Sequence, residues 1–477
     1  MFLETIATEG LSQLSYVLGD ERAGVCVVID PRRDTEAYLQ LARRHNARIT
    51  GILETHIHAD FVSGASELCA QTGAEIRVGR DPDGGTYNFK HIALADGDEI
   101  DIGALRLRAM HTPGHTPEHI SYLLSGGKGS VEPWAVFTGD TLFAGEVGRP
   151  DLLGEGSEQK LARELYHSLF QKLLPLGDEV AVYPAHGQGS PCGGSIGDRR
   201  TSTIGYERLH NARLQFKTED DFVRDVLCGL PPAPRYYKRV KAINREGAPV
   251  LGRVMDAASL DPQTFKRESE QPNAIIVDTR ELEAFGGAHI PGALSIPLRT
   301  KEFTIWAGWM LDPSQRILLV VSDESDIEEA QLSLLRIGLE NIGGYLRNGM
   351  RGWIEAALPF EQLKQMSVHE LNERAPHVVA GTDSLQILDV RRADEWRAGI
   401  VPGARHIFAP HIAGHTGELD SARPVAVYCG SGYRASIAAS VLKRAGFADV
   451  ANVPGSMSAW KAAGYETVKP TSENAIA

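Results

Sequence analysis

The sequence predicts an α/β protein of three domains, and three observations support this prediction. The chain has 477 residues, which is enough for three domains of about 150 residues each. In the first half, short apolar runs repeatedly end in a polar loop that carries His or Asp, as expected for a layered α/β domain with its site at the strand ends. In the second half, one pattern of strands and helices occurs twice.

The composition is that of a globular protein, with 42% hydrophobic and 23% charged residues. The net charge of −13, without blocks of Lys or Arg, argues against nucleic acid or an anionic membrane as a partner. Five cysteines, widely spaced, cannot form a disulfide framework and fit a reducing compartment. Because the N-terminus lacks the features of a signal peptide and no apolar run is as long as a membrane span, we expect a soluble, cytoplasmic protein.

The first domain alternates strands with helices. Its buried strands are rich in branched apolar residues, and the first of them is stopped by Pro31. A Pro-rich stretch between residues 230 and 249 has loop chemistry, so we place this domain at residues 1–245. The predicted strands span residues 24–30, 49–54, 106–110, 135–138 and 179–183, with a helix at residues 35–45.

An internal repeat divides the rest of the chain. Asp389 follows Asp278 by 111 residues, each in an apolar strand, and the Pro-Gly-Ala turn at 402–404 follows its counterpart at 291–293 by the same interval. Each copy alternates strands with helices over about 110 residues, which suffices for a small domain with a parallel sheet. We expect these domains at residues 250–362 and 363–470, followed by a disordered tail at residues 471–477.

Four strand-end loops of the first domain carry potential metal ligands. Side chains two residues apart in extended chain point the same way, so His56 and His58 face one side together. Neutral imidazole and carboxylate groups can hold Zn(II), Fe(II) or Mn(II), and the ligand type alone does not separate these metals. The candidate ligands are His56, His58, Asp60, His115, Asp140 and His186.

These loops resemble the metallo-β-lactamase superfamily, whose signature Thr-His-X-His-X-Asp-His is followed by a downstream His, Asp and His. Residues 55–60 match the signature, but Phe61 stands where its last His belongs. In superfamily hydrolases that His serves a second metal, so the resemblance favours a single-metal site. Within the superfamily, the segments at 111–117, 137–140 and 147–151 are similar to the persulfide dioxygenases, also called sulfur dioxygenases.

The resemblance implies an αββα sandwich and one mononuclear Fe(II) per chain, held by His56, His115 and Asp140. A site of two His and one carboxylate leaves positions on the iron for both substrate sulfur and O2. The other candidates would orient the ligands and water, or mark a vacant second metal site: His58, Asp60 and His186.

The resemblance also bears on two further residues of this domain. Arg149 is expected near the active site, where its guanidinium either binds an anionic thiol substrate or pairs with Asp151. Cys192 lies six residues after His186 and is either an inert loop thiol or a neighbour of the metal.

A second specialised loop lies in the last domain. A buried strand at residues 425–428 runs into Cys-Gly-Ser-Gly-Tyr-Arg at 429–434, and a helix follows at 435–445. Inward-pointing N–H groups, the helix dipole and Arg434 favour a thiolate at Cys429 and an anionic product such as a persulfide.

This loop and its flanking motifs resemble the rhodanese (thiosulfate sulfurtransferase) family, in which a six-residue loop is sized for sulfur. The resemblance implies that Cys429 is the sulfur-carrying nucleophile, with Arg434 beside it and the remaining loop residues around the substrate: Gly430, Ser431, Gly432 and Tyr433. The matching stretch of the first repeat, residues 320–326, has neither Cys nor Arg and is acidic, so we expect that copy to be inactive.

The whole chain resembles fusions of a metallo-β-lactamase domain with rhodanese domains, which implies a persulfide dioxygenase coupled to sulfur transfer. The implied partners are a thiol persulfide of the glutathione or coenzyme A type, O2, sulfite and thiosulfate, in a homo-oligomeric protein. One alternative is a glyoxalase-II-like thioester hydrolase that uses metal-activated hydroxide, although Phe61 argues against it. The other is a non-catalytic docking module, against which the intact ligands and cysteine loop argue.

Overall fold

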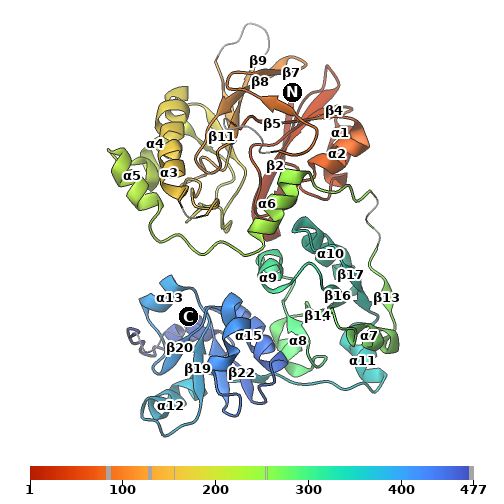
Figure 1. Ribbon diagram of the computed structural model, residues 1–477, viewed down its shortest axis with the longest axis vertical. Helices are drawn as coiled ribbons and strands as arrows, with labels where there is room; N and C mark the ends of the chain where they lie inside the picture. Colours follow the sequence, from red (N-terminus) through yellow and green to blue (C-terminus); the bar gives the residue numbers. More distant parts are fainter. Residues whose placement is uncertain (82–86, 127–131, 155, 253, 255, 472–477) are drawn as a thin grey trace. The chain divides into compact units, whose positions relative to one another are not determined.

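The computed structural model describes residues 1–81, 87–126, 132–154, 156–252, 254 and 256–471, and Figure 1 shows the course of the chain. The chain divides into two compact units, one made of Met1–Val254 with Leu335–Gly338 and the other of Met255–Leu334 with Leu339–Ala477. Apart from Thr471, the tail expected to be disordered lies outside the described residues. Among the helices that are described, none is long and apolar enough to cross a membrane.

The first unit contains two six-stranded sheets in the described part of the chain. One has the order β1(Phe2–Thr8), β2(Gln13–Asp20), β3(Val25–Ile29), β4(Arg48–Leu53), β5(Glu75–Gly79), β6(Ile92–Leu94). The other has the order β12(Ser202–Thr203), β11(Ala181–Pro184), β10(Ala135–Gly139), β9(Ile120–Gly126), β8(Leu105–His111), β7(Glu99–Ile102). The first sheet is parallel from β3 to β6, whereas the second is antiparallel except between β10 and β11.

The two sheets pack face to face, because side chains of both contribute to one core. Strand β3 shows how the sequence specifies this: Val27 and Ile29 join the core between the sheets, whereas Cys26 and Val28 face the helices on the other side. Such a strand is buried on both faces, which explains its uninterrupted apolar run.

Helices cover the outer face of each sheet (Figure 1). α1(Glu36–Arg44) and α2(Ala65–Thr72) contribute Tyr38 and Leu68 to the core under the first sheet. α3(Glu158–His167) and α5(Glu219–Val226) contribute Leu165 and Phe222 to the core under the second. The remaining helices of this unit are α4(Ile204–His210) and α6(Tyr237–Glu246). The four-layer αββα sandwich predicted from the sequence is therefore confirmed.

The second unit contains two five-stranded parallel sheets with the same order of strands. The first runs β13(Ser259–Leu260), β17(Ile342–Leu346), β16(Arg316–Val320), β14(Ala274–Asp278), β15(Leu294–Ser295). The second runs β18(Lys364–Gln365), β22(Val450–Asn452), β21(Val425–Tyr428), β19(Gln386–Asp389), β20(Ala404–His406). The two small α/β domains with parallel sheets expected from the repeat are confirmed.

The helices of the two repeats also correspond in order. The first repeat has α7(Pro262–Ser269), α8(Leu282–Gly287), α9(Phe303–Met310), α10(Ile327–Arg336) and α11(Gly349–Glu355). The second has α12(Val368–Val379), α13(Ala393–Ala398), α14(Ile412–His415), α15(Tyr433–Arg444) and α16(Ser456–Ala462).

The Asp-X-Arg motif shared by the repeats forms the same buried ion pair in each. Arg280 pairs with Asp278 at 2.6 Å, and Arg391 pairs with Asp389 at 2.6 Å. Each guanidinium also donates to a backbone carbonyl eight residues further along the chain. In each repeat the motif fastens the end of one strand, β14 or β19, to the loop that follows it.

The repeats contact each other through α15. Ser295 of β15 lies against this helix: its Oγ is 3.0 Å from Oγ of Ser436, and its N–H donates to Oγ of Ser440 at 3.1 Å. All three serines are fully buried. The first repeat therefore packs directly on the helix that follows the cysteine loop.

We expect Asp389→Ala to destabilise the last domain by about 3–5 kcal/mol, because it leaves the buried Arg391 guanidinium without its counter-charge. Calorimetric unfolding of the full chain measures this as a lowered transition for that domain. Asp394→Ala is the control, since Asp394 pairs with Arg392 on the surface and its loss should change little. Equal effects of the two substitutions would contradict the structural role of the buried pair.

Candidate metal centre and cysteine loop

Three of the candidate ligands converge at the ends of strands in the first unit. His56 follows β4, His115 follows β8 and Asp140 follows β10. Oδ2 of Asp140 lies 3.6 Å from Nε2 of His56 and 3.4 Å from Nε2 of His115. The three side chains form a group whose ligand atoms lie within 4.8 Å of one another, and each residue is at most 1% exposed.

The atoms that face this point lack other partners. Nε2 of His56 and Oδ2 of Asp140 are buried without a hydrogen bond in the described structure. A buried polar atom without a partner is costly, and a bound metal ion would satisfy both atoms at once. The donor set of two imidazoles and one carboxylate therefore fits a metal ion, including Fe(II).

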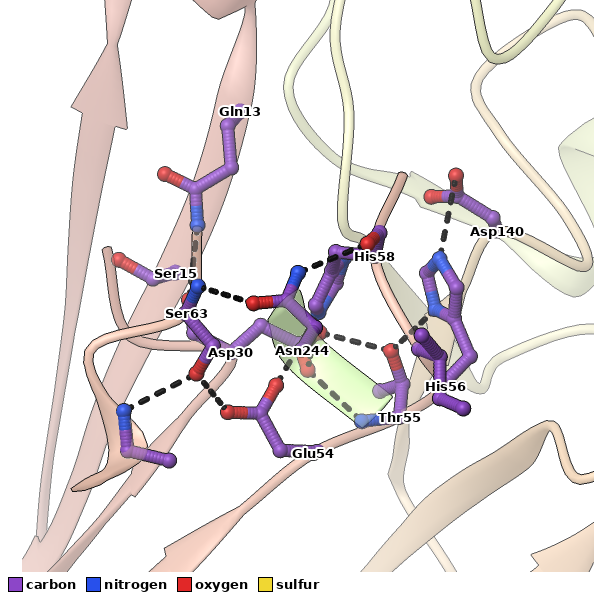
Figure 2. A network of polar contacts seen from close by, with 12 residues as sticks. Gln13, Ser15, Asp30, Glu54, Thr55, His56, His58, Ser63, Asp140 and Asn244 are labelled. Carbon is purple, nitrogen blue, oxygen red and sulfur yellow. Dashed lines mark hydrogen bonds and ion pairs between the residues drawn. The ribbon is translucent and has the colours of Figure 1, made fainter. Parts of the chain in front are cut away.

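The hydrogen bonds behind His56 fix which ring nitrogen is free (Figure 2). The Thr55 hydroxyl donates its only proton to Oδ2 of Asp30 at 2.8 Å, so at 2.9 Å it must accept a hydrogen bond from Nδ1 of His56. Nδ1 then carries the proton, and the lone pair of Nε2 points toward Asp140. The Nε2 atom of His115 is also left without a proton, because Nδ1 of this residue donates to the backbone carbonyl of Arg149 at 2.9 Å.

The protonation states of the three groups also suit a metal centre. Burial lowers the pKa of His56 and of His115, which keeps both imidazoles neutral. Burial alone would raise the pKa of Asp140, but the charge of His186 and its hydrogen bond outweigh burial and lower this pKa. Two neutral imidazoles and one carboxylate are the forms in which these residues ligate metals.

His58 does not face the same point. Its Nε2 lies 3.0 Å from Oδ1 of Asp30 and 3.2 Å from Oε2 of Glu54. Burial would lower the pKa of His58, but these two carboxylates raise it well above its ordinary value. His58 forms a separate group with Asp30 and Glu54, whose potential ligand atoms lie within 4.8 Å of one another, and it stands apart from the group of His56, His115 and Asp140.

Helix α6 holds the loop that carries His56 and His58. The Asn244 amide donates to the backbone carbonyls of His58 at 2.8 Å and Phe61 at 2.7 Å, and its oxygen accepts from the N–H of Ser63 at 2.9 Å. Figure 2 shows Asn244 between Ser63 and His58. One side chain from a distant part of the chain therefore fixes three backbone groups of the loop.

His186 and Asp60 lie behind Asp140. Nδ1 of His186 is 2.7 Å from Oδ1 of Asp140, and its Nε2 is 2.8 Å from Oδ2 of Asp60. Burial would lower the pKa of His186, but the two carboxylates raise it to about 10. By holding Oδ1 of Asp140, His186 leaves Oδ2 directed toward His56 and His115, so it orients a ligand.

Cys192 lies in the same region as the last two candidates. Its Sγ belongs to a group with Asp60 and His186 whose potential ligand atoms lie within 4.8 Å of one another. Burial raises the pKa of this thiol well above its ordinary value, so it stays protonated. Cys192 is therefore a buried, protonated thiol beside Asp60 and His186, outside the group of His56, His115 and Asp140.

Arg149 is paired rather than free. Its guanidinium binds the Asp151 carboxylate at 2.6 and 2.7 Å and donates to the carbonyls of Pro191 and Pro231. The residue is 2% exposed, and its own carbonyl positions His115. The pairing with Asp151 is thus present, and contact with a substrate stays a prediction.

The cysteine loop curls around Cys429 at the start of α15. The carbonyls of residues 429, 430 and 431 accept hydrogen bonds from N–H groups at residues 457, 458 and 455. Because a peptide N–H points opposite to its carbonyl, the N–H groups of the loop face the other side, and that of Gly432 donates to Sγ of Cys429 at 3.1 Å. Gly432 has φ 112°, a left-handed conformation that favours glycine.

Arg434 and Tyr433 flank the loop. A Cβ on Gly430 would lie 2.9 Å from Nη2 of Arg434, so the guanidinium passes close to the loop backbone. The same guanidinium binds the Glu395 carboxylate, and the Tyr433 hydroxyl donates to the carbonyl of Pro297 in the first repeat at 3.3 Å. The residues predicted for this site therefore share one loop.

In the matching loop of the first repeat, the acidic side chains bind groups of their own repeat. Asp323 accepts from the N–H of Ser325 at 2.8 Å, and Glu324 accepts from the N–H of Asn348 at 3.1 Å. Asp326 pairs with Arg299 at 3.2 Å. These contacts engage all three acidic side chains, and the loop carries no cysteine.

Four residues that contact these sites were not among the candidates predicted from the sequence: Asp30, Glu54, Asn244 and Glu395. Asp30 had a usable signal, since it is an acidic residue at the end of a buried strand. Asn244 and Glu395 had none, because each lies on a helix with no motif pointing to the loop that it contacts.

Comparisons with known proteins bear on both sites. A model of the metallo-beta-lactamase superfamily matches residues 8–186, a range that contains all six candidate metal ligands. A model of the rhodanese-like domain matches residues 261–356 and 374–463, and the second range contains the cysteine loop.

Individual relatives cover the first domain. A Burkholderia pseudomallei protein named probable metallo-hydrolase is 35% identical over 254 residues, which are 46% of this chain and 84% of the relative. The mitochondrial persulfide dioxygenase of Homo sapiens is 31% identical over 208 residues, which are 43% of this chain and 73% of that protein. The cytoplasmic hydroxyacylglutathione hydrolase of Arabidopsis thaliana is 37% identical over 175 residues, which are 36% of this chain and 62% of that protein.

A solved structure reaches beyond the first domain. The crystal structure of a metallo-beta-lactamase from Staphylococcus aureus aligns with a TM-score of 0.66 and 34% identity. The alignment covers 72% of this chain and 99% of that chain.

We expect Thr55→Val to weaken metal binding by about 10- to 100-fold, because it removes the acceptor that fixes the Nδ1 proton of His56. Titration of the apo-protein with a divalent metal against a chromophoric chelator measures the affinity. Thr50→Val is the matched control, since Thr50 lies on β4 and its hydroxyl donates only to the carbonyl of Cys26. Equal metal affinities in the two variants would contradict the positioning role of Thr55.

Proposed function

This chain belongs to the metallo-beta-lactamase superfamily and carries two rhodanese-like domains, and from that premise we propose that it is a persulfide dioxygenase coupled to a sulfurtransferase. In this proposal one Fe(II), held by His56, His115 and Asp140, serves the oxidation of a low-molecular-weight thiol persulfide by O2 to sulfite and free thiol. Cys429 of the last domain exchanges sulfane sulfur with persulfide, sulfite and thiosulfate.

The observation that carries the proposal is the separation of His58 from the ligand group. A superfamily hydrolase site with three imidazoles would need His58 turned toward Asp140, whereas here it pairs with Asp30 and Glu54. Two imidazoles and one carboxylate form the donor set of mononuclear iron oxygenases, with positions left for two further ligands. Similarity to the human persulfide dioxygenase over the first domain supports the same activity.

Iron, when bound, supplies the electron-transfer and O2 chemistry that amino-acid side chains lack. The residues of the chain hold and shield it: His186 directs Asp140, Thr55 directs His56, and the Arg149 carbonyl directs His115. All three side chains are almost completely buried, so bulk water would have little access to a metal ion held there.

Helix α6 carries a lysine, Lys241, that would favour an anionic substrate. Lys241 lies one turn from Tyr237 and Asn244 on the face that meets the metal-binding loops, and its charge acts on His115 and Glu118. Burial lowers the pKa of Lys241. A partly buried ammonium beside the centre is suited to the carboxylates of glutathione or the phosphates of coenzyme A.

Sulfur transfer at Cys429 requires no cofactor. The thiolate attacks the outer sulfur of a thiol persulfide, the sulfur–sulfur bond breaks, and the thiolate of the carrier leaves. Attack of sulfite on the resulting Cys429 persulfide forms thiosulfate and restores the Cys429 thiolate. The N–H of Gly432 stabilises the negative charge on Sγ in both steps.

The environment that we propose is the cytoplasm, with small molecules as reaction partners. All five cysteines are free, as suits a reducing compartment.

A thioester hydrolase is the second candidate, because the hydroxyacylglutathione hydrolase of Arabidopsis thaliana matches the first domain at 37% identity. Phe61 stands where the superfamily signature has a ligand for a second metal, and it packs on the His58 ring with centroids 4.4 Å apart. The two candidates differ in metal content and in their need for O2.

We expect the protein to hold one iron per chain after anaerobic loading and to consume O2 on glutathione persulfide. His115→Ala and Asp140→Ala should lose both iron and O2 uptake, because either change removes one of three ligands. Metal analysis and an oxygen electrode provide the measurements. Two tightly bound zinc ions together with thioester hydrolysis would favour the hydrolase instead.

We expect Cys429→Ser to keep O2 uptake on a thiol persulfide but to lose sulfur exchange between thiosulfate and sulfite, because a hydroxyl is a poor sulfur acceptor. Exchange is followed with labelled sulfite. Cys228→Ser is the control, since Cys228 is exposed on the first domain. Wild-type exchange in Cys429→Ser would show that the chemistry belongs to another residue.

A further inference from the structure

The Arg434 guanidinium, which lies close to the backbone of the cysteine loop, is already bound to a carboxylate. Arg434 pairs with Glu395 of α13 through two hydrogen bonds, Nη1 to Oε2 at 2.6 Å and Nη2 to Oε1 at 2.8 Å. The side chains are 18% and 26% exposed, so the pair is largely shielded from solvent. Such a two-point pair is the strong form of a salt bridge and holds the guanidinium in one orientation.

Two other charged residues near the loop, Glu302 and Arg392, do not free Arg434 from its carboxylate. Glu302 of the first repeat acts electrostatically on both Arg434 and Tyr433. Arg392 approaches Glu395 at 3.8 Å but is itself paired with Asp394 at 3.0 Å. The charge of Arg434 is therefore compensated by Glu395, and Arg392 is engaged with Asp394.

This balance matters because the possible sulfur donors differ in charge at the reacting end. Thiosulfate brings a dianion to the Cys429 thiolate, whereas the outer sulfur of a thiol persulfide carries at most one negative charge. In a partly buried site the repulsion between like charges several ångströms apart amounts to more than thermal energy. Unpaired, Arg434 would offset the charge of thiosulfate; bound to Glu395, it offers little compensation.

We propose that Glu395 is a specificity-determining residue that directs Cys429 toward thiol persulfides, and away from the inorganic dianion thiosulfate, as sulfur donors. The inference rests on the proposed sulfur-transfer function of Cys429 and is independent of the iron site. The favoured step is attack of the Cys429 thiolate on the outer sulfur of a thiol persulfide, with release of the carrier thiolate.

The test is the ratio of KM for thiosulfate to KM for glutathione persulfide in sulfur transfer by the full chain. Glu395→Gln keeps an acceptor for Arg434 but removes the negative charge, so the ratio should fall by about tenfold. Glu395→Asp retains the charge and should keep a ratio close to that of the wild type. Glu418→Gln is the matched control, because Glu418 pairs with His415 on the surface of the same domain.

A second variant keeps the test valid if Glu395→Gln fails to fold. Glu302→Gln removes a charge from the first repeat while keeping an acceptor for the Trp306 indole, and it should lower the same ratio by a smaller factor. An unchanged ratio in both variants, with sulfur transfer intact, would overturn the inference alone. A wild-type protein that transfers sulfur from neither donor would overturn the proposed function of Cys429, and the inference with it.

Discussion

The ion pair of His58 with Asp30 and Glu54 is the interaction on which the chemistry of the first domain depends. It removes one imidazole from the set that the sequence places at the strand ends, so two imidazoles and Asp140 remain. Asp30 serves twice, because its other oxygen accepts from the Thr55 hydroxyl and thereby fixes the tautomer of His56. The buried Asp30 carboxylate thus holds His58 away from the candidate metal centre and, through Thr55, orients His56 toward it.

The sequence predicts the parts of the sites that depend on local chain geometry. His56, His115 and Asp140 each follow a strand, and Cys429 begins a loop between a strand and a helix, so their positions follow from the order of elements. The direction of His58 could not be predicted, because it is set by Asp30, 28 residues earlier in the chain, and by burial. The same holds for Asn244, which reaches the metal-binding loop from a helix far along the sequence.

Arg149 and Arg434 show the same limit of local reasoning in another form. Both are cations in loops that suggest anion binding, and both are paired with acidic residues, Asp151 and Glu395. A motif fixes where a guanidinium lies, but only the fold shows how much of its charge is already compensated. The two repeats make the complementary point: they keep the same buried Asp-X-Arg pair and the same sheet, while only one keeps a nucleophile.

In our proposal a single metal ion is bound by His56, His115 and Asp140, with His58 outside the coordination sphere. A crystal structure of the anaerobically iron-loaded protein, with anomalous scattering recorded at the iron edge, would locate each bound ion. We predict one iron peak bonded to these three side chains, with the His58 ring still between Asp30 and Glu54. A bond between His58 and the metal, or a second metal peak beside Asp60 and His186, would contradict it.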